Sequence, residues 1–135
     1  MEVLKADHLS KIYGSGENEV RALDDVSFYI QQGEFVAIIG PSGSGKSTLL
    51  HILGGVDRPT SGKVYLDGKD IYGQNEEQLA IFRRREVGLV YQFYNLIPVL
   101  DVEENITLPV LMDGRPVNKE RLEELITLLG LSVRR

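Results

Sequence analysis

The sequence predicts an α/β fold in which a buried parallel sheet is joined to an antiparallel β layer. Residues 35–39 and 87–91 are continuous apolar runs, which are typical of strands buried on both faces of a parallel sheet. In residues 26–30 and 64–66, apolar residues recur at every second position, as in strands with one covered face. A chain of 135 residues has room for one domain. Two kinds of sheet are therefore expected within one domain.

Residues 40–47 read Gly-Pro-Ser-Gly-Ser-Gly-Lys-Ser and match the phosphate-binding pattern G-x-x-x-x-G-K-[ST] at every fixed position. Glycines allow backbone angles that turn successive amide N–H groups inward around a triphosphate. Lys46 adds a positive charge within reach of the terminal phosphates, and the Ser47 hydroxyl is a suitable magnesium ligand. The loop therefore predicts nucleotide binding with Mg2+, through Ser42, Gly43, Ser44, Gly45, Lys46, Ser47 and Thr48.

The segments on both sides of this loop are those that a phosphate site requires. The strand expected at 35–39 precedes the loop, and a helix is expected to begin at Lys46 and end at Gly54–Gly55. The N-terminus of that helix would direct free N–H groups and a positive dipole end at the phosphates. A glycine-rich surface turn that binds nothing is the alternative, and the order strand, loop, helix argues against it. The helical apolar stripe is Leu49, Ile52, Leu53 and Val56.

The other elements follow from alternation and from turn and capping residues. A half-exposed strand is expected over 1–12, and the pair Asp67-Gly68 predicts a hairpin. Asn75 and Gln78 are suited to begin a helix that carries Leu79 and Phe82 inward. In the last third, helices are expected after Asp101 and Asn118, with Pro109 kinking or ending the first of them and Gly130 ending the second.

Composition excludes several classes of protein. The formal charge of −5 provides no basic field for nucleic acid, although Arg83–Arg85 form a local cluster. With no cysteine, the chain has no disulfide and no thiolate metal site. No apolar run approaches the ~20 residues that cross a bilayer, and the N-terminus does not read as a signal peptide. We expect a soluble chain that would serve a membrane from its cytoplasmic side.

With these motifs in place, the sequence resembles the ATP-binding subunit of ABC transporters from Leu4 to Leu131. Residues 14–20 and 95–98 are most similar to the branch that serves macrolide export, lipoprotein release and antimicrobial-peptide resistance. The fold implied is an ABC-type P-loop NTPase core with an antiparallel β layer and the start of a helical subdomain, divided as 1–93 and 94–135. The matching stretches are 22–28, 33–39, the loop, 59–64 and 87–92.

The resemblance also implies roles for single residues. Tyr13 is similar to the aromatic residue that stacks on adenine, a contact that tolerates different bases because it uses the ring face. The alternative is a tyrosine that packs locally at a strand end. Gln92 is similar to the glutamine that ligates magnesium, senses the terminal phosphate and signals to the membrane subunit. Apart from the resemblance, a glutamine there is a solvated turn residue. Lys46 and Gln92 are thus the candidate catalytic residues.

The implied function is hydrolysis of Mg-ATP to drive transport by a partner permease at the inner face of the cell membrane. A second ATP-binding subunit would complete the site, and residues 94–102 would contact the permease. Residues 1–135 contain no L-S-G-G-Q signature, no carboxylate that orients water after it, and no switch histidine. The resemblance therefore implies that the fold is incomplete at its C-terminus and that this chain alone does not turn over ATP.

Three other functions remain possible at this point. A different P-loop enzyme is one, but the nearest match to the guanine-selecting N-K-x-D motif, residues 118–121, has arginine in place of aspartate. A nucleotide-binding module without turnover is another. The third is a soluble ABC ATPase acting on DNA or ribosomes, which the acidic charge balance disfavours.

Overall fold

The computed structural model describes residues 2–41, 43–92 and 95–134. These residues divide into two compact units, Met1–Gly88 and Leu89–Arg135. The loop and helix with the phosphate-binding pattern belong to the first unit, whereas Gln92 belongs to the second.

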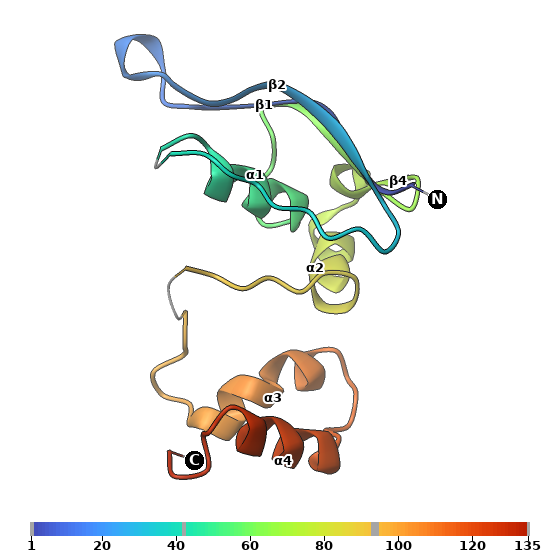
Figure 1. The fold of residues 1–135 in the computed structure, drawn as a ribbon, viewed down its shortest axis with the longest axis vertical. Helices are drawn as coiled ribbons and strands as arrows, with labels where there is room; N and C mark the ends of the chain where they lie inside the picture. Colours follow the sequence, from blue (N-terminus) through green and yellow to red (C-terminus); the bar gives the residue numbers. More distant parts are fainter. Residues whose placement is uncertain (1, 42, 93–94, 135) are drawn as a thin grey trace. The chain divides into compact units, whose positions relative to one another are not determined.

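An antiparallel sheet of four strands is the main feature of the first unit (Figure 1). β1 and β2 form a long hairpin, β3 pairs with the other edge of β1, and β4 pairs with β3. The structure therefore confirms the antiparallel layer that alternation predicted. The bounds are Glu2–Tyr13 for β1, Val20–Gln31 for β2, Ser61–Leu66 for β3 and Lys69–Asp70 for β4, with the 3-10 helix η1 at Gly16–Asn18.

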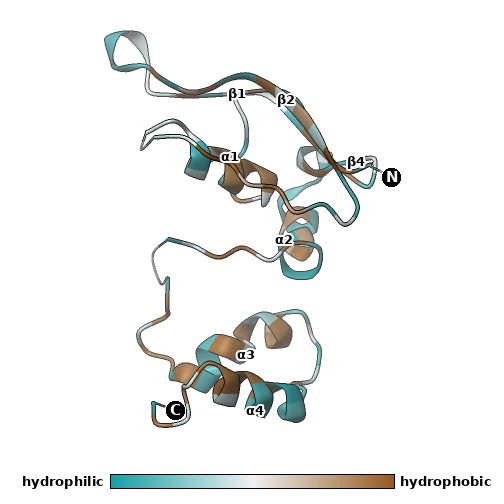
Figure 2. Ribbon diagram, viewed as in Figure 1, coloured by the Kyte–Doolittle hydropathy of each residue, from teal (hydrophilic) through white to brown (hydrophobic). Residues whose placement is uncertain are grey.

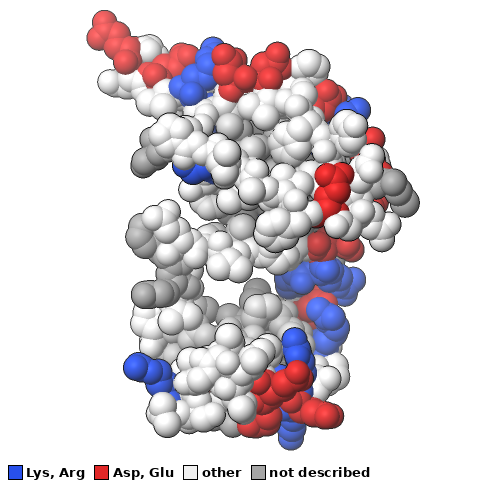
Figure 3. Space-filling view, viewed as in Figure 1, with Lys and Arg blue, Asp and Glu red and all other residues white. Residues whose placement is uncertain are grey.

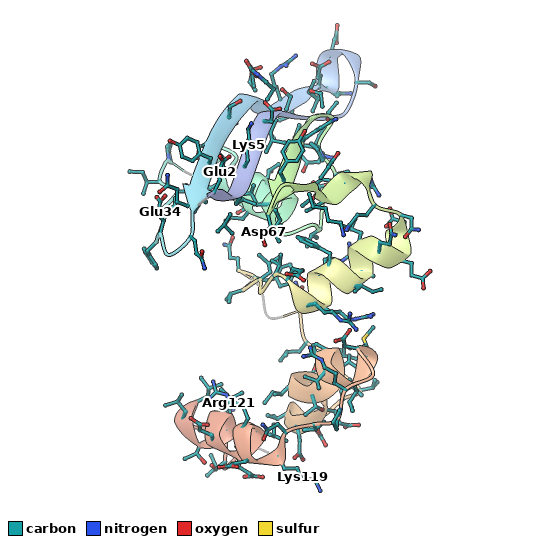
Figure 4. All side chains as sticks on the ribbon, turned by 90° about the vertical axis from the view of Figure 1, so that its right-hand side faces the viewer. Glu2, Lys5, Glu34, Asp67, Lys119 and Arg121 are labelled. Atoms are coloured by element: carbon teal, nitrogen blue, oxygen red, sulfur yellow. The ribbon has the colours of Figure 1, made fainter. Side chains whose placement is uncertain are left out.

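Two irregular positions shape this sheet. His8 and Asp25 have φ of 50° and 53°, and the β1–β2 register shifts around them, which is a β-bulge. On the other side of β1, a Cβ on Gly62 would fall 2.2 Å from the His8 carbonyl oxygen, so only glycine fits there. The β3–β4 turn at Asp67, labelled in Figure 4, has φ of 50° and 80° at its two central residues and confirms the predicted hairpin.

Two helices pack against this sheet to form the core of the first unit. α1 spans Lys46–Leu53 and lies along the β1–β2 hairpin, and α2 spans Glu76–Arg85 after the 3-10 helix η2 at Ile71–Gly73 (Figure 1). Both helix starts agree with the sequence, and Asn75 and Gln78 form a capping box on α2. Val56 lies beyond the end of α1 and is exposed, so it is not part of the predicted stripe. The buried core is Ala6, Leu9, Leu23, Leu49, Ile52, Val64, Ile71, Leu79 and Phe82.

The prediction of two parallel strands is wrong for this structure. Neither 35–39 nor 87–91 is a strand, and Phe35, Ile39 and Val90 are 98%, 90% and 96% exposed. A strand requires a neighbour that pairs its backbone N–H and C=O groups, and no described strand pairs with either segment. The apolar pattern predicted burial, but burial of a strand depends on partner strands, and the described residues do not supply them.

The second unit contains α3, Val102–Met112, and α4, Lys119–Leu128. Asp101 and Glu104 form a capping box on α3, and Asn118 caps α4, as predicted. α3 does not end at Pro109 but continues for three more residues, because the Asp113 N–H donates to the Pro109 carbonyl and holds the last turn. α3 is largely hydrophobic (Figure 2) yet has no buried residue. In α4, two aliphatic side chains are buried, those of Leu122 and Ile126.

Two properties of the structure concern possible partners: the charge on its surface, and the length and apolar content of its helices. Acidic side chains gather around η1 at the end of the β1–β2 hairpin (Figure 3), among them Glu17 and Glu19. None of the helices in the described part of the chain combines the length and the apolar content needed to cross a membrane.

Candidate functional site

The glycine-rich loop has the backbone geometry that its pattern requires. Gly43 and Gly45 have φ of 82° and 92°, in the left-handed region that favours glycine. A Cβ on Gly45 would lie 2.4 Å from the Ala22 carbonyl oxygen in β2. The loop therefore approaches the sheet so closely that no larger residue fits at this fixed position of the pattern.

The N-terminus of α1 is suited to bind an anion. Its N-cap is Gly45, which has no side chain to accept hydrogen bonds from the first-turn N–H groups. Lys46, Ser47 and Thr48 form that first turn, where the helix dipole is positive. Backbone donors, a hydroxyl and an ammonium group therefore meet at one helix end.

The Lys46 ammonium group folds back over the loop. Its Nζ donates to the carbonyl oxygens of Gly40 and Pro41, the latter at 2.9 Å. An ammonium group has three N–H donors, so it can bind a phosphate oxygen beside these carbonyls or in place of them. The Lys46 ammonium group therefore lies at the loop.

The side chains present fit a magnesium-bound triphosphate. Mg2+ is usually held by one or two protein oxygens together with phosphate oxygens and water, and the exposed Ser47 hydroxyl can be one such ligand. Ser42, which the sequence places in the same site, lies outside the described residues. The remaining predicted loop residues, 43–48, lie together in the loop and the first turn of α1.

Tyr13, the last residue of β1, lies beside this helix. Its hydroxyl donates to Asp57 Oδ2 at 2.7 Å, and its ring centroid is 5.1 Å from Lys11 Nζ. Lys11 Nζ also donates to Asp57 Oδ1 at 3.1 Å and to the Arg58 carbonyl oxygen at 2.6 Å. The Thr48 side chain is near enough to the Tyr13 hydroxyl to affect its titration. The Tyr13 side chain therefore lies beside the first turn of α1.

The electrostatics of this group favour the ionised carboxylate and the neutral phenol. Burial by itself raises the pKa of Asp57, but hydrogen bonds from Tyr13 and Lys11 outweigh it, so the pKa is lowered. The pKa of Tyr13 is raised, first by burial and then by its bond to the Asp57 carboxylate. At neutral pH Tyr13 is consequently a hydrogen-bond donor to a charged acceptor, which is a strong form of the bond.

Comparison with known proteins decides the family. A family model described as ABC transporter matches residues 23–135. The chain belongs to the ABC transporter ATP-binding family. Its fold agrees: the dimeric structure of MJ0796, described as a bacterial ABC transporter cassette, matches with a TM-score of 0.83 and 40% identity, over 94% of this chain and 56% of that one.

Curated relatives in the ABC family support the same assignment. An uncharacterized ABC transporter ATP-binding protein of Thermotoga maritima is 49% identical over 98% of this chain and 58% of its own length. The lipoprotein-releasing system ATP-binding protein LolD of Aquifex aeolicus is 47% identical over 96% of this chain and 57% of its own length. The family resemblance predicted from the motifs is confirmed, and LolD belongs to the predicted branch. The chain spans less than two thirds of the length of these relatives.

Gln92, the remaining predicted site residue of the ABC family, lies in an exposed bend of the second unit. The strand expected to end at this residue is not formed. Its assignment as a magnesium ligand therefore stays a prediction that rests on the family motif.

Lys11 and Asp57 both contact Tyr13, and sequence reasoning singled out neither of them. Asp57 is 44 residues from Tyr13 and 46 from Lys11 along the chain. A single Asp after the helix end at Gly54–Gly55 has no local pattern that would single it out. Their contacts with Tyr13 depend on β1 lying beside the segment that follows α1.

Proposed function

We propose that this protein binds Mg-ATP at the loop 40–47 and, in its complete form, hydrolyses ATP to drive a membrane permease. The observation that carries this proposal is the loop itself: Gly45 packs on β2 at φ of 92°, and Lys46 reaches over the loop carbonyls at the start of α1. Membership of the ABC family makes ATP the expected nucleotide. A second structure of the MJ0796 cassette is described as a post-hydrolysis state bound to ADP and Pi.

Within this site each residue has a proposed role. The amides of residues 43–48 bind phosphate oxygens, together with Ser42 by its place in the motif. Lys46 compensates the charge of the terminal phosphates, and Ser47 contributes a magnesium ligand. Gln92 would be the second protein ligand and the sensor of the terminal phosphate, and Tyr13 would stack on the base.

The proposed partner is a membrane permease that docks on the turn before α3. Leu96, Ile97 and Val99 are 64%, 39% and 89% exposed, as expected for a surface that contacts another protein. Tyr94, also expected in this surface, lies outside the described residues. We place the protein on the inner face of the cell membrane, with 94–135 as the start of its helical subdomain. A second ATP-binding subunit would pair with it, and no nucleic acid is involved.

Turnover is proposed for the complete subunit, not for residues 1–135 alone. Phosphoryl transfer needs a group that orients the attacking water and charges that stabilise the transition state. This stretch carries neither the signature nor the water-orienting carboxylate of the family. Phosphate release by residues 1–135 should be negligible beside that of the protein at its full natural length. Comparable rates for the two would overturn this part of the proposal, leaving ATP binding as the function of the loop.

Titration with ATP, with and without Mg2+, tests the binding function. Lys46→Ala should abolish most of the binding because it removes the main cationic partner of the phosphates. Lys119→Ala is the matched control, since it removes the same charge from the exposed start of α4 in the other unit (Figure 4). Equal affinity of the wild type and Lys46→Ala would refute the site, and equal losses in both variants would point to a general charge effect.

A further inference from the structure

Tyr13 is held at its hydroxyl edge and on one face of its ring. The Tyr13 hydroxyl donates a hydrogen bond to Asp57 Oδ2, with 2.7 Å between the two oxygens. Lys11 Nζ lies 5.1 Å from the ring centroid. The same carboxylate binds Lys11 through Oδ1 at 3.1 Å. The Asp57 carboxylate therefore binds both the Tyr13 hydroxyl and the lysine that lies over the Tyr13 ring.

Asp57 is itself tied to the end of the loop helix. Its N–H donates to the His51 carbonyl oxygen at 3.3 Å, and its carbonyl oxygen accepts from the Tyr72 hydroxyl at 2.8 Å. The same hydroxyl lies 2.5 Å from the Ile52 carbonyl oxygen, so its one proton is shared between the two carbonyl oxygens. Burial raises the pKa of Tyr72, so this hydroxyl stays protonated and keeps donating. The carboxylate that anchors Tyr13 is therefore positioned by α1, whose other end carries the phosphate loop.

Tyr13 remains 42% exposed in this arrangement. Because Lys11 Nζ lies over one face of the ring, a base that stacks on Tyr13 would use the opposite face. A base that stacks on that face would meet a ring whose hydroxyl is hydrogen-bonded to Asp57. This bond restrains rotation of the Tyr13 side chain. Ordering a side chain before a ligand arrives removes an entropic cost from the binding step.

We propose that Asp57 is a positioning residue that presents one face of Tyr13 to the nucleotide base, with Lys11 closing the other face. This inference rests on the proposed function, because it assumes that a nucleotide occupies the loop. It differs from stacking alone, in which the hydroxyl of Tyr13 has no part. The ring belongs to β1, and its anchor is tied to the end of the helix that follows the loop.

The test separates the base from the phosphates. Binding of ATP and of inorganic tripolyphosphate, each with Mg2+, is measured for the wild type, Asp57→Ala, Tyr13→Phe and the double variant, using the protein at its full natural length. Tripolyphosphate has no base, so the anchor should not affect it. We expect each single variant to bind ATP roughly two- to tenfold more weakly, the cost of ordering one side chain, with tripolyphosphate unchanged.

The double variant tests whether the two residues act through one bond. If they do, the double variant loses no more affinity for ATP than either single variant. Asp57→Asn retains an acceptor oxygen and should fall between the wild type and Asp57→Ala. Tyr13→Phe keeps the ring and leaves Asp57 in place, so it carries the test if Asp57→Ala does not fold.

Several outcomes would overturn the inference. Equal losses for ATP and tripolyphosphate would show that Asp57 merely supports the fold of the loop. Additive losses, or an unchanged affinity of Tyr13→Phe for ATP, would show that the hydroxyl bond does not matter. Lys46→Ala separates this failure from failure of the proposed function, because it should weaken both ligands. If the wild type bound neither ligand, the proposed function would fail and the inference with it.

Discussion

The side chain of Asn105 pairs with both backbone groups of Ile97. Asn105 Oδ1 accepts from the Ile97 N–H at 2.9 Å, and Nδ2 donates to the Ile97 carbonyl oxygen at 3.3 Å. The same Nδ2 lies 3.1 Å from the Leu100 carbonyl oxygen and 2.9 Å from that of Asp101. One amide on α3 thus holds the turn that carries the exposed apolar residues of the proposed permease surface.

Removing this amide should loosen the turn. We expect Asn105→Ala to release backbone groups that are now paired, at a cost of about 0.5–1.5 kcal/mol of local stability for each hydrogen bond lost, and to speed hydrogen exchange at the Ile97 amide. Thr107→Val is the control, because the Thr107 hydroxyl donates to the Glu103 carbonyl oxygen within α3 and not to the turn. Unchanged protection of Ile97 in Asn105→Ala would mean that the turn is held by other contacts.

The two left-handed glycines of the loop should respond differently to alanine. Gly43 and Gly45 have similar φ, so each substitution carries the cost of a left-handed alanine, about 1–2 kcal/mol. Only at Gly45 would the added Cβ also clash with the Ala22 carbonyl oxygen, at 2.4 Å, whereas Gly43 has open space around it. Thermal unfolding should therefore show a larger loss for Gly45→Ala than for Gly43→Ala. Equal losses would mean that the loop moves away from β2 without cost.

The titration of His8 should report its bond to Asp25. Nδ1 of His8 lies 2.6 Å from Asp25 Oδ1, and this hydrogen bond, with the charges of Asp25 and Asp7, raises the His8 pKa above 6.5. Because the folded state favours the charged imidazole, the stabilisation is fully present below pH 6.5 and is lost as the pH rises through the raised pKa. NMR titration of the His8 ring should give a midpoint above 6.5, and Asp25→Asn should lower it. A wild-type midpoint at or below 6.5 would show that the pair does not form in solution.

The nucleotide site should discriminate weakly among bases. Stacking on Tyr13 would use the face of the base, and the sequence shows no motif for reading base edges. ATP and GTP should bind with similar affinity, and Tyr13→Ala should weaken both by about 1–3 kcal/mol. Competition binding with the two nucleotides measures this. A strong preference for guanine would show that other groups in the site read the edge of the base.

The bond between Tyr13 and Asp57 also changes one expectation drawn from the sequence. If Tyr13 used only its ring face, Tyr13→Phe would be nearly neutral for binding. The hydroxyl has a charged partner in the structure, so its loss should be measurable. This difference arises because a sequence pattern shows which residue can stack but not what holds it.

Sequence alone determined those features that depend on neighbours within a few residues. The start of α1 after the glycine loop, the capping box of Asn75 and Gln78, and the hairpin turn at Asp67 all agree with the structure. Each of these features is stabilised by contacts within one helical turn or one tight turn. Such contacts join residues that are close together in the sequence, so a local pattern predicts them.

Tertiary structure alone decided the features that need distant partners. The apolar run at 35–39 reads as a buried strand, but a strand forms only where another strand pairs with its backbone, and Phe35 is 98% exposed. Asp57 reads as an ordinary turn residue until β1 brings Tyr13 and Lys11 to it across 44 and 46 residues. A local pattern states what a segment can bury or bond, whereas its partner is set by how the whole chain folds.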